Sequence, residues 1–207
     1  RYLNKFIQIK KILDKKLIGK ILFFEIKYFH NEKNHPTANL QRNKIIPWRF
    51  NKSISGGGNI MDMGIHAIDL VYFLLGSIKK VTSLNKSQMK FFNVEDITLV
   101  NFELKNNVLG QGAWCSTASE KIDEFKIHGR KGTIKFRMNY GEDNTVVISI
   151  NNKKINKKIK METPLHKNMF KSFVDQLIKL NKAKKFKINE NGLFCSKIIF
   201  DILDFKS

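Results

Sequence analysis

The chain has 207 residues, of which 42% are apolar, so it is long enough to bury a hydrophobic core, and its composition argues against wholesale disorder. Its formal net charge of +20 would suit a nucleic-acid-binding protein, but arginine, which contacts bases and phosphates best, stands only at positions 1, 42, 49, 130 and 137. The other basic residues are lysines, and the chain is also rich in Asn, Ile and Phe, whose codons, like those of Lys, are rich in A and T. A nucleotide bias of the genome therefore explains the charge, and we expect no nucleic-acid partner.

The first half of the chain predicts a helix, a strand, a long loop and a second helix. Apolar residues recur at helical spacing over 4–17, and a strand rich in Ile and Phe follows at 20–29. Residues 31–55 have no clear periodicity, and a loop of this length is often functional. The next helix is expected from 57 to 75, where Gly76 ends it.

From Ile78 the apolar residues recur at every second position, which is typical of strands with one buried face. The first two clear strands form a hairpin around a Lys-Asn-Asn turn, and a lysine-rich turn with a solvated edge strand closes the series. The expected strands cover 98–104, 108–117, 124–128, 133–136 and 145–150, with the edge strand within 151–160.

The chain ends in two predicted helices. The first begins at Thr163-Pro164, and Asn189 caps the second, which carries several isoleucines. The first helix has an apolar stripe formed by Phe170, Phe173, Val174, Leu177 and Ile178. This order of elements predicts a single α+β domain in which helices pack on one face of a sheet.

Nothing in the sequence predicts a membrane span or a secreted protein. Asp69 interrupts the most apolar segment, 65–75, which is shorter than the roughly 20 residues that cross a bilayer. Cys115 and Cys195 lack the spacing of a disulfide framework or a zinc ribbon, and we expect both to be small core residues. We therefore predict a cytoplasmic protein with no membrane partner.

The segment from Ser55 to Leu70 is the most informative part of the chain. Three glycines open its helix, on which Asp62 and His66 lie four residues apart and thus on one face, within reach of a shared ligand. An imidazole beside a carboxylate can move a proton near neutral pH. The alternative is structural: a carboxylate that favours the helix start, and a core histidine. Asp69, one turn further, would orient the imidazole, or it would be solvated or make a cap-like bond to the preceding loop.

The residues around this segment suggest binding and do not suggest a metal. Trp48 and Arg49 precede the glycines and are either ligand contacts or a packed aromatic ring with its covering arginine. The glycines predict a tight turn rather than a phosphate cradle, because no Gly-x-Gly-x-x-Gly or Walker motif is present. We expect no metal, because the other histidines lack metal-ligand spacing: His30, His35, His128 and His166.

Taken together, Trp48-Arg49, the Ser-Gly-Gly-Gly run and the Asp62-x-x-x-His66-x-x-Asp69 pattern resemble one family. It is the glucose–fructose oxidoreductase, inositol dehydrogenase and rhizopine-catabolism group, Gfo/Idh/MocA, and the similarity is to its C-terminal domain. It extends over nearly the whole chain, since three further segments fit: Leu17-Ile18-Gly19-Lys20-Ile21, Val94-Glu95-Asp96 and the turn from His128 to Ile134.

This resemblance implies an open-faced, largely antiparallel sheet, with residues 1–207 as the substrate-binding and oligomerisation domain. An NAD(P)-binding Rossmann domain would precede it, and homo-oligomers would form through the sheet. By similarity, His66 would be the general acid/base at the substrate hydroxyl, and Asp62 would bind the substrate or tune the histidine. Trp48 and Arg49 would line the mouth of the substrate site, with Arg49 also near the cofactor, NAD or NADP.

We thus expect the substrate-binding and catalytic half of an NAD(P)-dependent oxidoreductase that acts on the CH–OH group of a sugar or polyol. The family's Glu-Lys-Pro motif and a glycine-rich nucleotide-binding turn do not occur, so we expect this chain alone to be inactive. A non-enzymatic sugar-binding or assembly module is the alternative, and a nucleic-acid-binding protein ranks third. Four strand residues are weaker candidates for ligand contacts: Glu25, Lys27, His30 and Trp114.

Overall fold

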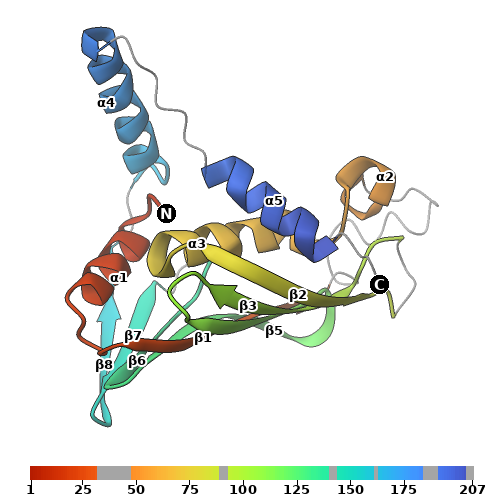
Figure 1. Cartoon of the computed structure of the whole chain (residues 1–207), viewed down its shortest axis with the longest axis horizontal. Coiled ribbons are helices and arrows are strands. Elements are labelled where there is room, and N and C mark those ends of the chain that lie inside the picture. Colours follow the sequence, from red (N-terminus) through yellow and green to blue (C-terminus); the bar gives the residue numbers. More distant parts are fainter. Residues whose placement is uncertain (32–47, 89–92, 140–143, 161–162, 184–190, 204–207) are drawn as a thin grey trace.

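The computed structural model describes residues 1–31, 48–88, 93–139, 144–160, 163–183 and 191–203. They form an eight-stranded sheet with helices on one of its faces (Figure 1). The strands are β1 Ile21–Asn31, β2 Ile78–Lys86, β3 Ile97–Leu104, β4 Leu109–Cys115, β5 Thr117–Gly129, β6 Gly132–Phe136, β7 Thr145–Ile150 and β8 Lys153–Lys158. The helices are α1 Asn4–Asp14, the short η3 Trp48–Phe50 and α2 Lys52–Ser55, the π-helical turn η4 Ile60–Gly64, α3 Ile65–Leu75, α4 Lys167–Ala183 and α5 Asn191–Leu203.

The sheet has the order β2-β3-β4-β1-β5-β6-β7-β8, so the first strand of the chain lies near its middle. β1 runs parallel to β4, and every other neighbouring pair is antiparallel. The predicted open-faced, largely antiparallel sheet is therefore confirmed. The predicted hairpin is the pair of β3 and β4, and its turn places Asn107 at a φ of 64°. β8 is an exposed edge strand, as its lysines predicted.

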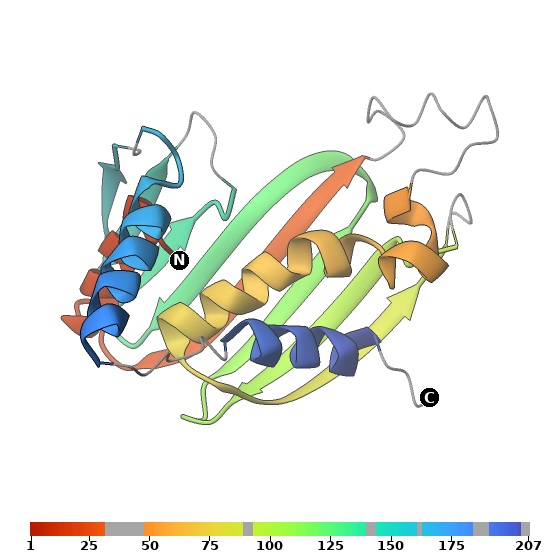
Figure 2. The ribbon, with the colours of Figure 1, turned by 90° about the horizontal axis from the view of Figure 1, so that it is seen from above.

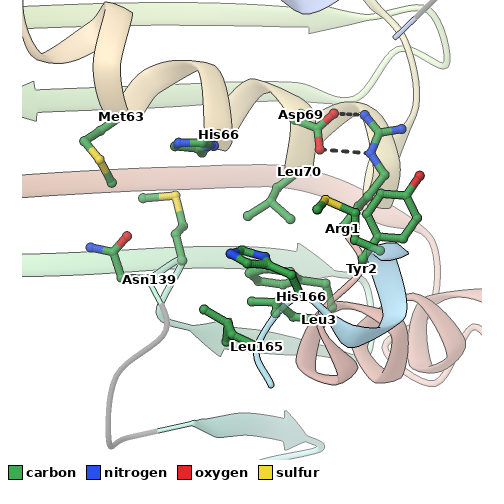
Figure 3. Close-up of a pocket in the computed structure, with 13 residues that line it drawn as sticks. Arg1, Tyr2, Leu3, Met63, His66, Asp69, Leu70, Asn139, Leu165 and His166 are labelled. Atoms are coloured by element: carbon green, nitrogen blue, oxygen red, sulfur yellow. Dashed lines mark hydrogen bonds and ion pairs between the residues drawn. The ribbon is translucent and has the colours of Figure 1, made fainter. Parts of the chain in front are cut away.

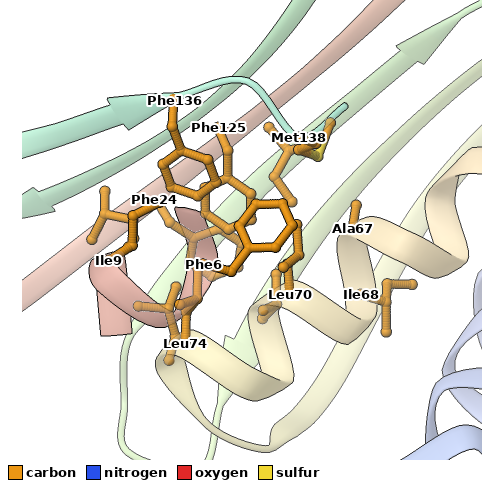
Figure 4. Packing of buried hydrophobic residues seen from close by; sticks show 14 of the residues in the cluster. Phe6, Ile9, Phe24, Ala67, Ile68, Leu70, Leu74, Phe125, Phe136 and Met138 are labelled. Atoms are coloured by element: carbon orange, nitrogen blue, oxygen red, sulfur yellow. The ribbon is translucent and has the colours of Figure 1, made fainter. Parts of the chain in front are cut away.

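Aromatic rings fill the centre of the covered face. Phe125 lies between Phe24 and Phe136, with ring centroids 6.0 and 4.9 Å away, and Phe6 of α1 meets Phe136 edge-on (Figure 4). A side chain at Gly110 of β4 would collide with the ring of Phe24, so the packing requires glycine there. Because successive residues of a strand point to opposite faces, the apolar residues gather on the face that the helices cover.

The helices α3 and α5 lie side by side across this face (Figure 2). Ile68 and Val71 of α3 and Ile199 and Ile202 of α5 are fully buried. The helical run from Lys52 to Leu75 is long and apolar enough to cross a membrane by length and composition, and is thus longer than the apolar segment expected from the sequence. In the fold, seven residues of this run belong to the hydrophobic core: Ile60, Ala67, Ile68, Leu70, Val71, Leu74 and Leu75.

Several expectations about single elements need correction. Thr163 and Pro164 precede α4, which begins at Lys167, and the predicted cap Asn189 lies outside the described residues. The apolar stripe of α4 is exposed, because the helix projects away from the sheet (Figure 1). The predicted loop 31–55 contains η3 and α2 over its last part, and its first part lies outside the described residues.

The two cysteines differ. Cys195 is buried in α5, as expected, and burial raises the pKa of its thiol. Cys115 is half-buried rather than in the core, because its position in β4 alternates with Trp114 and so points to the uncovered face of the sheet.

Candidate functional site

The glycine run before α3 is a site of close backbone approach. Gly56 ends α2 with a φ of +80°, which confirms the predicted tight turn. Gly58 donates its N–H to Oε1 of Glu95 over 2.7 Å, and a side chain at Gly58 would meet the carbonyl oxygen of Glu95. Burial raises the pKa of Glu95 against the opposing effect of its backbone hydrogen bonds. The glycines thus let the chain pass over Glu95 into the helix.

The helix begins with the π-helical turn η4, which carries Asp62, and continues as α3 from Ile65. A side chain at Gly64 would overlap that of Ile60, so glycine at this position permits the tight contact across the turn. Single π-helical turns within helices are frequent at functional sites. Asp62 and His66 are both exposed, and within the described part of the chain no hydrogen bond or ion pair joins them.

Asp62 lies with Trp48 and Arg49, as the sequence grouped them. Nε of Arg49 is 3.5 Å from Oδ2 of Asp62, and its guanidinium lies 4.9 Å from the centre of the Trp48 ring. About half of both charged side chains is exposed, so their attraction is largely screened by solvent. These three residues border a shallow hollow of about 140 Å³ that also touches the glycine run.

His66 opens on a different and larger cavity of about 310 Å³. Figure 3 shows His66 and Met63 on the helix side, with His166, Leu165 and Asn139 across from them. Most of the lining side chains are apolar, and a few polar groups stand among them. The lining residues are Arg1, Tyr2, Leu3, Phe6, Met63, His66, Asp69, Leu70, Met138, Asn139, Leu165, His166 and Met169.

At the end of this cavity, Asp69 binds Arg1 with both carboxylate oxygens (Figure 3). Nε of Arg1 donates to Oδ2 over 3.0 Å, and Cys195 donates from Sγ to Oδ1 over 3.8 Å. Asp69 therefore makes a structural bond, but to the first residue of the chain and to α5 rather than to the preceding loop. Among the described residues, no hydrogen bond connects it to His66.

The four weaker candidates from the strands lie elsewhere. Glu25 and Lys27 stand on the uncovered face of the sheet, where Glu25 pairs with His128 at 3.0 Å. Trp114 is wrong as a ligand contact, because only 1% of it is exposed and it packs beneath the helices. His30 is half-buried in β1, with its ring 5.3 Å from that of Tyr28.

Sequence reasoning missed the far wall of the cavity. Arg1, Tyr2, Asn139 and His166 come from three distant parts of the chain and share no spacing with His66. Tertiary folding alone brings them together, so no local pattern would have found them. In the portion that the structure describes, no group of three or more metal-ligating side chains is placed to hold a metal ion.

This arrangement can perform acid–base chemistry on a small ligand. The exposed imidazole of His66 can exchange a proton with a hydroxyl group in the cavity, since imidazole is the commonest general acid and base in proteins. The apolar walls would exclude water from the rest of the ligand, which strengthens polar contacts made there.

Comparisons with curated proteins find relatives that are longer than this chain. Oxidoreductase P35 of Formosa agariphila is 32% identical over 138 residues, which are 66% of this chain and 40% of that protein. Levoglucosan dehydrogenase of Pseudarthrobacter phenanthrenivorans is 33% identical over 75 residues, 36% of this chain and 18% of that protein. The matched segments thus cover less than half the length of either relative.

Solved structures share the fold. Levoglucosan dehydrogenase, in complex with NADH and levoglucosan, superimposes with a TM-score of 0.73 at 18% identity, over 95% of this chain and 59% of that chain. Aldose–aldose oxidoreductase from Caulobacter crescentus, complexed with glycerol, gives 0.73 at 16% identity, over 96% and 57%. The family follows from the sequence itself, because the family model of the GFO/IDH/MocA C-terminal domain matches residues 6–135. The chain therefore belongs to the Gfo/Idh/MocA family and forms the C-terminal domain of that family.

Proposed function

We propose that this chain is the substrate-binding and catalytic domain of an NAD(P)-dependent oxidoreductase that acts on the CH–OH group of a sugar, a polyol or a related derivative. The observation that carries the proposal is the exposed imidazole of His66 at a cavity of about 310 Å³, a size suited to a small ligand. Relatives in the same family support it, since levoglucosan dehydrogenase was crystallised with NADH and L-sorbose.

In this proposal His66 moves the proton of the reacting hydroxyl. Oxidation of CH–OH to C=O removes a hydride from carbon and a proton from oxygen, and the neutral imidazole accepts that proton. In the reverse direction the imidazolium returns it to the carbonyl oxygen. Asp62, whose carboxylate stays beside the Arg49 guanidinium, binds a neighbouring hydroxyl of the substrate. Trp48 and Arg49, which border the hollow beside Asp62, would line the mouth of the substrate site.

The residues of this chain fit one end of a dinucleotide. His66 is exposed at the cavity, so a planar ring can approach it from outside. No Gly-x-Gly-x-x-Gly turn occurs in the 207 residues, and the phosphates would be held by a preceding Rossmann domain. NAD or NADP, when bound, supplies the hydride acceptor. Residues 1–207 alone should therefore show no turnover.

The decisive experiment uses the full-length protein, with the nucleotide-binding domain, and a panel of sugars and polyols with NAD and NADP. His66→Ala should lower kcat about 10²–10⁴-fold, while the affinity for NAD(P)H and the Tm stay close to those of the wild type. His66→Gln serves as the matched variant, because an amide can hydrogen-bond the substrate but cannot accept its proton. Equal kcat in wild type and both variants would reject His66 as the acid/base.

A non-enzymatic sugar-binding or assembly module is the second candidate. It needs only the cavity at His66 as a binding site and no proton transfer there. A full-length protein that binds sugars at equilibrium, but never reduces NAD or NADP with any of them, would establish this second function.

We also propose that the uncovered sheet face joins two copies of the protein in the cytoplasm. Leu84 and Leu99 pair across β2 and β3 on that face, with 69% and 44% of their surface exposed, and Leu109 of β4 is 55% exposed. These leucines are the apolar side chains that such a contact would bury. Leu99→Asp should dissociate the oligomer in analytical ultracentrifugation, whereas Leu193→Asp, on the outer side of α5, should not.

A further inference from the structure

The cavity at His66 has a second imidazole on its opposite wall. His166 comes from the segment just before α4 and faces the space that His66 enters from α3 (Figure 3). Among the described residues, neither ring has a hydrogen-bond partner, and both side chains are exposed. A polar ring without a partner at an otherwise apolar wall is available to a ligand.

The backbone that carries His166 is held in place. Its carbonyl oxygen accepts from the N–H of Phe170 over 3.0 Å, and the N–H of Lys167 donates to the carbonyl of Pro164 over 3.0 Å. Asn168 donates from Nδ2 to the carbonyl of Tyr2 over 3.0 Å and to Oδ1 of Asn4 over 3.2 Å. This start of α4 is therefore fixed to the beginning of the chain, and His166 is aimed at the cavity by structure already formed.

Asn139 is a further polar side chain in the cavity lining, which also includes Arg1, Tyr2 and Asp69. Its N–H donates to Asp123 over 2.9 Å, its carbonyl accepts from Nζ of Lys5 over 2.8 Å, and its Nδ2 donates to the hydroxyl of Tyr28 over 3.1 Å. With so many bonds the residue has little freedom. The ligand thus meets polar groups on two sides of the cavity and apolar side chains between them.

We propose that His166 is a specificity-determining residue of this site, where its imidazole hydrogen-bonds a hydroxyl group of a monosaccharide-sized polyol whose reacting hydroxyl lies at His66. A volume of about 310 Å³ is at the small end of ligand sites, so a single sugar ring fits and an oligosaccharide does not. The apolar walls fit the C–H faces of that ring. This inference rests on the proposed function of His66 but assigns a separate role, in binding rather than in proton transfer.

The test compares His166→Ala, His166→Gln and Lys167→Ala in the full-length protein with levoglucosan, L-sorbose, D-glucose and glycerol as probes. His166→Ala should raise KM about tenfold for a ring sugar, as expected for one lost hydrogen bond, with kcat within about twofold. His166→Gln should recover most of the affinity, since its amide can still hydrogen-bond. Lys167→Ala, one residue further and outside the cavity lining, is the matched control.

Histidine resonances in NMR spectra of the full-length protein give a readout that does not depend on turnover. Saturating sugar should shift the signals of both His66 and His166. A wild type that is active, with an unchanged KM in His166→Ala, would overturn the role of His166 and leave the proposed function intact. A wild type without turnover, whose two imidazole signals still shift with sugar, would reject the oxidoreductase and retain His166 as a binding residue. Absence of both turnover and shift would reject both.

Discussion

Replacing Gly58 with alanine places a methyl group against the backbone carbonyl oxygen of Glu95, where no rotamer change can relieve the contact. The methyl group would also lie 3.1 Å from Oε1 of Glu95 and 3.2 Å from Cγ2 of Val94. The glycine run must therefore move away from Glu95, and the hydrogen bond of 2.7 Å between Gly58 and its carboxylate is weakened.

The expected loss of stability follows from these two effects. Overpacking at a rigid site costs about 1–3 kcal/mol, and a weakened hydrogen bond about 1 kcal/mol, so the total is about 2–4 kcal/mol. For a chain of this size, that corresponds to a decrease in Tm of about 5–15 °C. Gly192→Ala is the matched control, because nothing lies within 4 Å of a side chain added there, and a helical alanine gains up to about 1 kcal/mol over glycine.

Thermal unfolding followed by far-UV circular dichroism measures both variants against the wild type. The reasoning predicts a large decrease in Tm for Gly58→Ala and no decrease for Gly192→Ala. If Gly58→Ala melts within about 2 °C of the wild type, the close approach to Glu95 is not a constraint, and the argument that glycine is required before η4 is refuted.

Three further predictions concern charge and packing. Because burial raises the pKa of Glu95, its protonated form favours folding, and the stability of the fold decreases as the pH rises above the ordinary pKa of a glutamic acid. Glu95→Gln should remove this dependence, so its Tm advantage over the wild type should grow as the pH rises above about 4, and a difference in Tm that stays constant with pH would contradict this. Arg49→Ala should change the free energy of unfolding by less than about 1 kcal/mol, since the ion pair of Arg49 with Asp62 is exposed. The same variant should raise KM for sugar or cofactor in steady-state kinetics, and an unchanged KM would show that Arg49 does not contact either ligand. Phe125→Ala should cost about 3–5 kcal/mol in urea unfolding, because its fully buried ring contacts rings on both sides, and a loss below about 1 kcal/mol would contradict this packing.

The fold could be predicted in outline because its signals are local. Alternating apolar residues marked most strands, and the turn at Lys105-Asn106-Asn107 marked the β3–β4 hairpin. Alternation indicates which residues share a face, but not which strand lies beside which. Alternation therefore could not predict that β1 runs parallel to β4, nor that helices cover Trp114.

The candidate site was predictable to the same degree. Asp62, His66, Trp48 and Arg49 are close in sequence, and their grouping around the start of one helix could be expected. The π-helical turn and the separate surroundings of Asp62 and His66 depend on packing against Glu95 and Ile60, which sequence spacing does not reveal. His166 is 100 residues from His66, and only the docking of Asn168 onto the first residues brings it near.

The central place of β1 has a consequence for how the protein is made. β1 ends at Asn31, yet its two neighbours in the sheet begin at Leu109 and Thr117, and these two strands pair with β1 rather than with each other. During synthesis, β1 therefore has no partner strand until β4, which ends at Cys115, has left the ribosome. Insertion of β1 between two antiparallel meanders joins them into one sheet. This late, non-local step should limit the folding rate. Until it occurs, the free edges of β1 can pair with strands of other chains, which promotes aggregation.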